Sequence, residues 1–224
     1  MTIHRRIGAR LARAGLAGLC ALSLAACALP RVTQRPAQTE YRLLPPSVRQ
    51  DAAGLRPVVL RVGAIGAAPG LGGVAMLYSA QPLQLMPYRD SRWVAPPADM
   101  IASALRQALA RQPWVAAVQG DAMSGRVDGA LDCHLDALEH DVYSGKVRLA
   151  LSCQLLDVRT GDPFAAWDFD ASRGIGRQDA RDYAQAAQDL LGRAVSMALS
   201  HTASALRVEQ QAAAARGAAP QAAR

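Results

Sequence analysis

Two long alternating segments separated by a short turn constrain the fold of this chain more than any other feature. Residues 126–141 and 146–158 each alternate apolar and polar side chains, which is the period of a strand with one buried face. Between them, Tyr143-Ser144-Gly145 suits a three-residue hairpin loop whose glycine adopts the left-handed conformation. We therefore expect an antiparallel hairpin over these residues to be the framework of the domain.

The expected hairpin places two cysteines near each other. A three-residue loop pairs residues whose numbers sum to 288, so Cys133 faces Leu155 and lies one diagonal step from Cys153. A disulfide needs α-carbons within about 7 Å. It therefore requires a bulge or a small change of register in this hairpin. Without that change, Cys133 and Cys153 are expected to be small buried hydrophobic groups, and the sequence leaves both alternatives open.

The segments around this hairpin complete an α+β prediction. After a turn at 159–162, residues 163–170 predict a third strand of the same meander. Pro97 and Asp99 favour the start of a helix that runs to about Arg111, and Asp179 favours the start of a second helix. The expected fold is an antiparallel or mixed sheet with a β-meander packed against two main helices. Shorter strands are expected at 41–44, 57–63, 75–78, 83–88 and 115–118, and the second helix is expected to end near Arg207.

The first residues have the pattern of an export signal. Four arginines lie within the first 13 residues, and an apolar stretch extends over 11–24. That stretch is shorter than the roughly 20 residues of a spanning helix. The run Leu24-Ala25-Ala26-Cys27 fits the lipobox of bacterial lipoproteins, in which cleavage leaves a lipidated Cys27 as the new N-terminus. An acidic residue after that cysteine typically retains a lipoprotein at the inner membrane, so Ala28 favours the outer membrane. A plain secretory signal and an uncleaved anchor are the alternatives.

These features divide the chain into four parts. Residues 1–26 are predicted to be the signal peptide, and 27–39 the lipidated cysteine and a tether. Residues 40–208 are predicted to be the folded domain. The alanine-rich segment 209–224 has low complexity and is predicted to be disordered.

Charge and motifs favour a binding role over catalysis. The formal net charge of +7 falls to +3 when the four signal arginines are subtracted, and the remaining arginines are scattered. A nucleic-acid interface needs a clustered basic face, so no nucleic-acid partner is expected. The glycine-rich segment 64–74 lacks the Lys-Ser/Thr of a phosphate loop, and no Gly-x-Ser-x-Gly occurs. We expect no enzyme activity and no cofactor.

One polar group on the predicted hairpin has the residue types of a metal site. Asp132, His134 and Asp136 share one face of a strand because strand side chains alternate. The opposite face carries Leu131, Cys133 and Leu135, and no His-x-x-x-His or Cys-x-x-Cys spacing is present. The favoured interpretation is a solvent-exposed strand face without a metal.

The order of several short motifs resembles a known family. The lipobox at Cys27 is followed by Tyr41-Arg-Leu-Leu-Pro45 and Leu60-Arg-Val-Gly63, then by a Met76-Leu-Tyr78 hairpin and by Arg92-Trp93 before the first long helix. Over residues 40–205 the chain resembles the ABC-type transport auxiliary lipoproteins, the group that contains the PqiC lipoprotein. The glycine-rich segment around 69–73 is looser than in that family, and the alanine-rich tail is extra.

The resemblance implies a function and partners. It implies a periplasmic lipoprotein, anchored in the outer membrane, that docks an MCE-type lipid transport system with its inner-membrane permease and ATPase. A homo-oligomer is compatible with docking onto a ring-shaped MCE partner. The alternatives are a periplasmic lipid-binding chaperone and a structural lipoprotein that assists another outer-membrane assembly.

A partner interface is predicted around Arg92 and Trp93, because Trp and Arg are enriched at interface hot spots. Tyr78 and Tyr88 on the hairpin are weaker candidates. The competing interpretation is that Trp93 packs under the helix that follows it while Arg92 is solvated.

Overall fold

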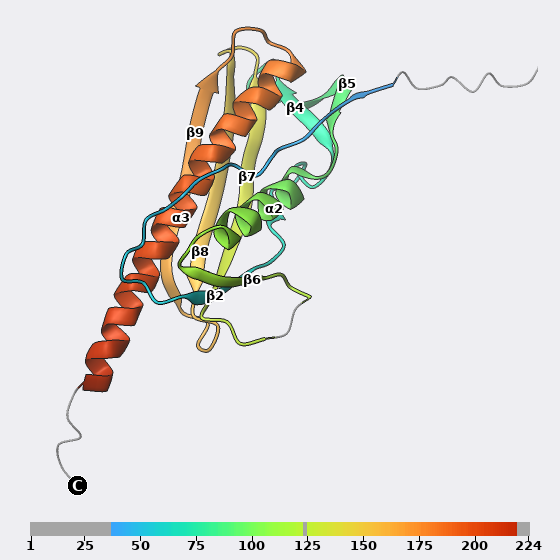
Figure 1. Cartoon of the computed structure of the whole chain (residues 1–224). Coiled ribbons are helices and arrows are strands. Elements are labelled where there is room, and N and C mark those ends of the chain that lie inside the picture. The colour runs from blue at the N-terminus through green and yellow to red at the C-terminus, as the bar shows by residue number, and fades with distance from the viewer. Residues whose placement is uncertain (1–36, 123–124, 219–224) are drawn as a thin grey trace, which may run out of the picture. The chain divides into compact units, whose positions relative to one another are not determined.

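The computed structural model describes residues 37–122 and 125–218. Within them a nine-stranded mixed sheet is combined with two helices, which confirms the predicted α+β class (Figure 1). The elements are β1 (Thr39–Tyr41), β2 (Val58–Val62), β3 (Gly66–Ala67), β4 (Ala75–Ser79), β5 (Met86–Trp93), α2 (Pro97–Ala110), β6 (Val115–Gln119), β7 (Gly129–Asp141), β8 (Lys146–Leu156), β9 (Pro163–Gly174) and α3 (Ala180–Ala218).

Strand β7 organises the sheet. One of its edges pairs antiparallel with β8, and β8 pairs antiparallel with β9, as the predicted meander requires. The other edge pairs in parallel with β2, then β3, then β4, in the order in which those strands follow along the chain. Strand β6 pairs with β2, β5 with β4, and β1 with β5. The meander therefore forms the continuous half of the sheet, and short strands form the other half.

The register of the central hairpin differs from the prediction in two places. Asp141 pairs with Lys146, so the loop has four residues, although Gly145 has the expected positive φ of 65°. A bulge at Asp136 then shifts the pairing by one more residue, because two residues of β7 oppose one of β8. The predicted pairing of Cys133 with Leu155 is therefore wrong, and Cys133 pairs with Cys153 instead.

Both helices lie on one face of the sheet (Figure 1). Helix α3 contacts β8 and β9, and α2 contacts β2 and β6. The alternating apolar residues of the strands turn toward the helices and form one core with them. Its largest fully buried side chains include Trp93, Tyr183, Leu60, Met76, Ile101, Leu109, Leu135, Leu149 and Leu190.

Helix α3 begins where the sequence predicts and ends later. The carboxylate of Asp179 accepts a hydrogen bond of 2.9 Å from the backbone N–H of Asp182, which is the expected N-cap. The helix continues to Ala218, because the alanines and glutamines after Arg207 are strong helix formers. The predicted disorder of 209–224 is thus wrong for 209–218, and 219–224 lies outside the described residues.

Residues 42–57, here named the strap, join β1 to β2 without regular structure and pass over the helices (Figure 1). The predicted strand 41–44 is displaced, because β1 ends at Tyr41. Gln188 accepts from the Leu44 N–H at 2.7 Å and donates to its carbonyl at 2.9 Å. Gln210 binds Arg56 in the same way, at 2.9 and 3.1 Å. Side-chain amides of α3 therefore replace a neighbouring strand.

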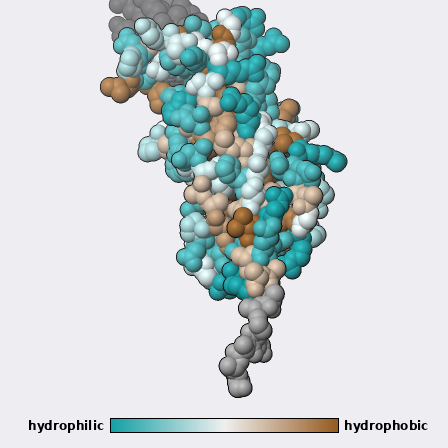
Figure 2. All heavy atoms as spheres, turned by 90° about the vertical axis from the view of Figure 1, so that its left-hand side faces the viewer, coloured by the Kyte–Doolittle hydropathy of each residue, from teal (hydrophilic) through white to brown (hydrophobic). Residues whose placement is uncertain are grey.

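The surface on the α3 and β9 side is mainly hydrophilic, with small apolar areas between polar ones (Figure 2). No helix within 37–122 and 125–218 is long and apolar enough to cross a membrane. The predicted signal peptide, Leu24, Ala25, Ala26 and Cys27 lie outside the described residues.

Candidate functional site

Strand β5 places Arg92 and Trp93 on opposite faces of the sheet. Trp93 is 1% exposed, and its ring meets Tyr183 of α3 edge-on at 5.6 Å. A side chain buried to this extent cannot contact a partner while the fold is closed. Arg92 is exposed and pairs with Glu40, with its Nε at 3.0 Å from the carboxylate. Arg92 therefore links β1 to β5. The predicted interface role stays a prediction for Arg92, and burial removes it for Trp93.

Tyr78 and Tyr88 do lie together, as part of a larger group that we name the aromatic cluster: Tyr78, Tyr88, Trp93, His140 and Tyr183. The rings of Tyr78 and Tyr88 are 5.1 Å apart, and Tyr88 lies 6.2 Å from the ring of His140. Tyr183 is 6.0 Å from His140. The cluster joins the β4–β5 hairpin, β7 and the first turn of α3 into one unit.

Hydrogen bonds inside the cluster link uncharged groups. The hydroxyl of Tyr88 lies 2.6 Å from Nδ1 of His140. Burial raises the pKa of Tyr88 to about 12, and the nearby Asp179 adds to this rise. Burial lowers the pKa of His140, against the smaller opposing effect of Asp141 and Asp179. At neutral pH both groups are therefore uncharged, and one hydrogen bond joins the phenol to Nδ1.

The remaining polar atoms of the cluster show what it can do. The hydroxyl of Tyr183 donates to the carbonyl of Leu138 at 2.9 Å, and burial raises the pKa of Tyr183 well above its usual value. Nε2 of His140 is buried without a hydrogen-bond partner among the described residues. Such a neutral network orients the hairpin on the domain. The sequence pattern indicates Tyr183 as a core residue but gives no sign that it would meet His140.

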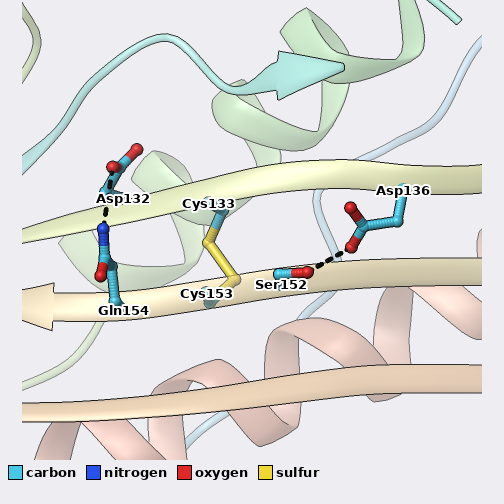
Figure 3. Close-up of a disulfide and its surroundings, with 6 residues drawn as sticks. All are labelled: Asp132, Cys133, Asp136, Ser152, Cys153 and Gln154. Atoms are coloured by element: carbon cyan, nitrogen blue, oxygen red, sulfur yellow. Dashed lines mark hydrogen bonds between the residues drawn. A yellow bond between two sulfur atoms is a disulfide. The ribbon is translucent and has the colours of Figure 1, made fainter. Parts of the chain in front are cut away.

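The two internal cysteines form a disulfide in the centre of the meander (Figure 3). Their α-carbons are 4.1 Å apart, the spacing of the closer kind of antiparallel pair. Cys133 and Cys153 are 6% and 7% exposed and belong to the core. The alternative of two separate thiols is therefore wrong. A bridged pair of this kind is typical of an oxidising compartment outside the cytoplasm.

The strand face opposite the helices is polar, as predicted. Asp132, His134 and Asp136 are all exposed. Asp132 accepts a hydrogen bond of 3.3 Å from Gln154, and Asp136 accepts one from the Ser152 hydroxyl (Figure 3). Of the residues that the structure describes, no group of three or more His, Cys, Asp or Glu is placed to hold a metal ion.

Three exposed residues at one end of the molecule were missed by the sequence reasoning. Leu83 is 109% exposed, Leu85 50% and Tyr143 88%. All three follow strands that end at the same edge of the domain. The available signal was limited to Tyr143, a large residue in a predicted turn. Leu83 and Leu85 fall in the strand predicted over 83–88, whereas β5 begins only at Met86.

A comparison with protein families confirms the family resemblance of the sequence. Residues 41–198 match the family described as ABC-type transport auxiliary lipoprotein component. The chain belongs to this family. Family membership makes it an auxiliary lipoprotein of an ABC-type transport system, located at a membrane of the cell envelope.

Solved structures share the fold. A crystal structure from Xanthomonas campestris, assigned to the DUF330 family, is similar with a TM-score of 0.71 and 21% identity, over 77% of this chain and 99% of that chain. A crystal structure of an uncharacterized protein has a TM-score of 0.56 and 14% identity, over 75% of this chain and 97% of that chain. No curated protein sequence matches the chain.

Proposed function

We propose that this auxiliary lipoprotein is anchored in the outer membrane, faces the periplasm and docks an MCE-type lipid transport system there. The observation that carries the proposal is the family match over 41–198, which takes in all of α2 and the first half of α3. The partners would be an MCE-domain protein and, through it, the inner-membrane permease and ATPase. A homo-oligomer that matches a ring-shaped partner stays a prediction.

The packing of the domain favours docking over direct lipid binding. The core between helices and sheet is filled by side chains that are almost fully buried. The hollow between the strap and the end of α3 is lined by Arg56, Arg207 and Gln210 together with small residues. Lipid sites are mostly apolar, and a hydrocarbon chain in this hollow would lie against charged and amide groups.

Cross-linking in cells tests the docking proposal. A photo-reactive amino acid would replace Arg92 or, on the exposed face of β9, Asp168, in the full lipidated chain. The same residue at Trp93 is the matched control, because that position is buried and should give only internal cross-links. We expect recovery of an MCE-domain protein from at least one exposed position. Recovery of phospholipid alone would favour the chaperone function, and recovery of another outer-membrane assembly would favour the structural one.

The membrane assignment has a separate test. In Ala28→Asp, an acidic residue follows the lipidated cysteine, and we expect the protein to move from the outer-membrane to the inner-membrane fraction of a density gradient. Ala28→Ser is the matched control and should stay in place. If the unchanged protein already sediments with the inner membrane, the outer-membrane part of the proposal is wrong.

A further inference from the structure

Three large apolar side chains project from one end of the domain, and we name them the tip surface: Leu83, Leu85 and Tyr143. Leu83 and Leu85 lie in the turn between β4 and β5, and Tyr143 lies in the turn between β7 and β8. Among the residues with described exposure, these are three of the seven exposed large hydrophobic residues. Two turns that are far apart in the sequence therefore concentrate apolar area at one place.

Backbone contacts hold the two turns together. The N–H of Val142 donates to the carbonyl of Ser79 at 2.9 Å, which joins the end of β4 to the start of the β7–β8 turn. Leu83, Leu85 and Tyr143 border one hollow together with Glu139 and Asp141. The tip surface is therefore a single feature of the fold, and its position is fixed relative to the sheet.

The backbone at Leu83 is unusual. This residue has a φ of 66°, a left-handed conformation that bulky side chains rarely adopt. A glycine or asparagine would relieve the strain. The turn instead carries a fully exposed leucine there, at a cost to the stability of the isolated domain.

The described chain enters the domain beside the tip surface. Strand β1 runs parallel to β5, with Thr39 opposite Ser91. The side chain of Gln38 donates to the carbonyl of Arg89 at 2.8 Å. Strand β5 begins at Met86, directly after Leu85, so Gln38 and Thr39 lie beside the strand that follows the tip surface. Only ten residues separate Gln38 from Cys27, a span of at most about 35 Å.

We propose that the tip surface lies against the phospholipid surface of the membrane in which the Cys27 lipid is anchored, with Leu83, Leu85 and Tyr143 in the headgroup region. This inference rests on the lipid anchor of the proposed function. The short tether holds the tip near the bilayer, so that weak apolar contacts suffice to orient the domain.

The chemistry of the tip fits a bilayer better than a protein groove. Two aliphatic side chains and one tyrosine combine apolar insertion with a phenol that favours the headgroup level. Lys146 is exposed at the start of β8, next to the β7–β8 turn, where it would meet lipid phosphates.

Fluorescence quenching in vesicles tests this orientation. The full lipidated chain would be reconstituted in vesicles of phosphatidylethanolamine and phosphatidylglycerol that contain brominated phosphatidylcholine. An amino acid with an environment-sensitive fluorophore would replace Leu83, Tyr143 or, as a matched control, Val158. Val158 is also an exposed apolar residue, 39% exposed, but it follows β8 at the opposite end of the meander. We expect quenching at 83 and 143 to exceed that at 158 at least threefold.

A second variant separates the tip from the anchor. With the fluorophore at Gln84, the combined change Leu83→Ser, Leu85→Ser and Tyr143→Ser should leave co-sedimentation with vesicles intact but reduce quenching to the level at 158. Thermal unfolding should be nearly unchanged, because the replaced side chains are exposed.

Each other outcome overturns the inference in a recognisable way. Co-sedimentation with equal quenching at 83 and 158 would place the tip away from the bilayer while keeping the lipid anchor. Blue-shifted emission at 83 without quenching by bromine would show that a second copy of the chain covers the tip. Loss of co-sedimentation in the unchanged protein would show that the anchor, and with it the proposed location, is wrong.

Discussion

The β7–β9 meander and the strap solve the same problem in different ways. Every buried backbone N–H and carbonyl needs a hydrogen-bond partner. In the meander, neighbouring strands supply the partners along two continuous ladders, and a disulfide crosses the centre. In the strap, glutamine side chains from the helices supply them one residue at a time. The meander is therefore stabilised by many equivalent backbone hydrogen bonds, whereas the strap depends on a few individual glutamine side chains.

The most buried of these glutamines lies at the end of α2. Gln112 is 2% exposed and accepts from the N–H of Gln50 at 2.9 Å. Its amide nitrogen donates to the carbonyls of Val48 and Ala108 at 2.9 and 2.8 Å. One side chain thus satisfies groups of both the strap and the helix end.

The largest effect is expected from removing the disulfide of the meander. Cys133→Ala with Cys153→Ala opens a link between residues separated by 20 positions, which should lower the free energy of unfolding by about 3 kcal/mol. Chemical denaturation of the variant and of the wild type would measure it. The wild type in reducing agent should unfold like the variant. Equal stability with and without reductant would show that the ladders alone hold the meander.

A smaller effect is expected at the buried end of the strap. Gln112→Ala leaves the Gln50 N–H and the carbonyls of Val48 and Ala108 without this partner, which should cost about 2 kcal/mol. Gln107→Ala, on an exposed face of the same helix, is the matched control. A loss below about 0.5 kcal/mol for Gln112→Ala would mean that water replaces the amide.

The exposed clamp at Leu44 should contribute less and act locally. Gln188→Ala should cost about 1 kcal/mol and speed amide hydrogen exchange at Leu44 with little change in β8. Gln185→Ala, one turn earlier on α3 and exposed, serves as the control. Faster exchange throughout the meander would contradict the view that the strap opens independently.

The smallest effect should depend on pH and distinguish the two regions. Because burial lowers the pKa of His140 below its ordinary 6.5, the stability gained by keeping it neutral is fully present above pH 6.5 and is lost as the pH falls below that value. Amide side chains of the strap do not titrate in this range. Hydrogen exchange should therefore accelerate near His140 and not at Leu44, and His140→Gln should remove the pH dependence above about pH 5. If the pH dependence of hydrogen exchange is unchanged in His140→Gln, a titratable group other than His140 causes it.

The regular half of the fold could be predicted because its pattern is local. Alternation over 126–141 and 146–158 indicates the hairpin, and Pro97 and Asp179 indicate where the helices begin. The bulge at Asp136 has no comparable signal, since any residue can occupy it, and it decides that Cys133 meets Cys153. The parallel pairing of β2, β3 and β4 with β7 depends on packing across the whole domain.

The candidate site was harder to predict because its parts meet through tertiary contacts. Arg92 and Trp93 are adjacent in sequence, but strand alternation sends one outward and the other into the core. The link between Leu44 and Gln188 joins residues 144 positions apart. Nothing in the composition around Leu44 or around Gln188 indicates that these two residues form a contact. Tyr143 stands out in the sequence as a large residue in a predicted turn, whereas the strand predicted over 83–88 conceals the exposure of Leu83.

The glutamine clamps have a consequence for how this domain can change over generations. Gln188 and Gln210 bind only the N–H and carbonyl of Leu44 and Arg56, which nearly every residue type provides. The outward side chains at these two positions can therefore be replaced without loosening the attachment of the strap. Substitutions at these positions can therefore change the outer surface of the strap and the contacts it makes, while the two glutamines hold its backbone in the same place.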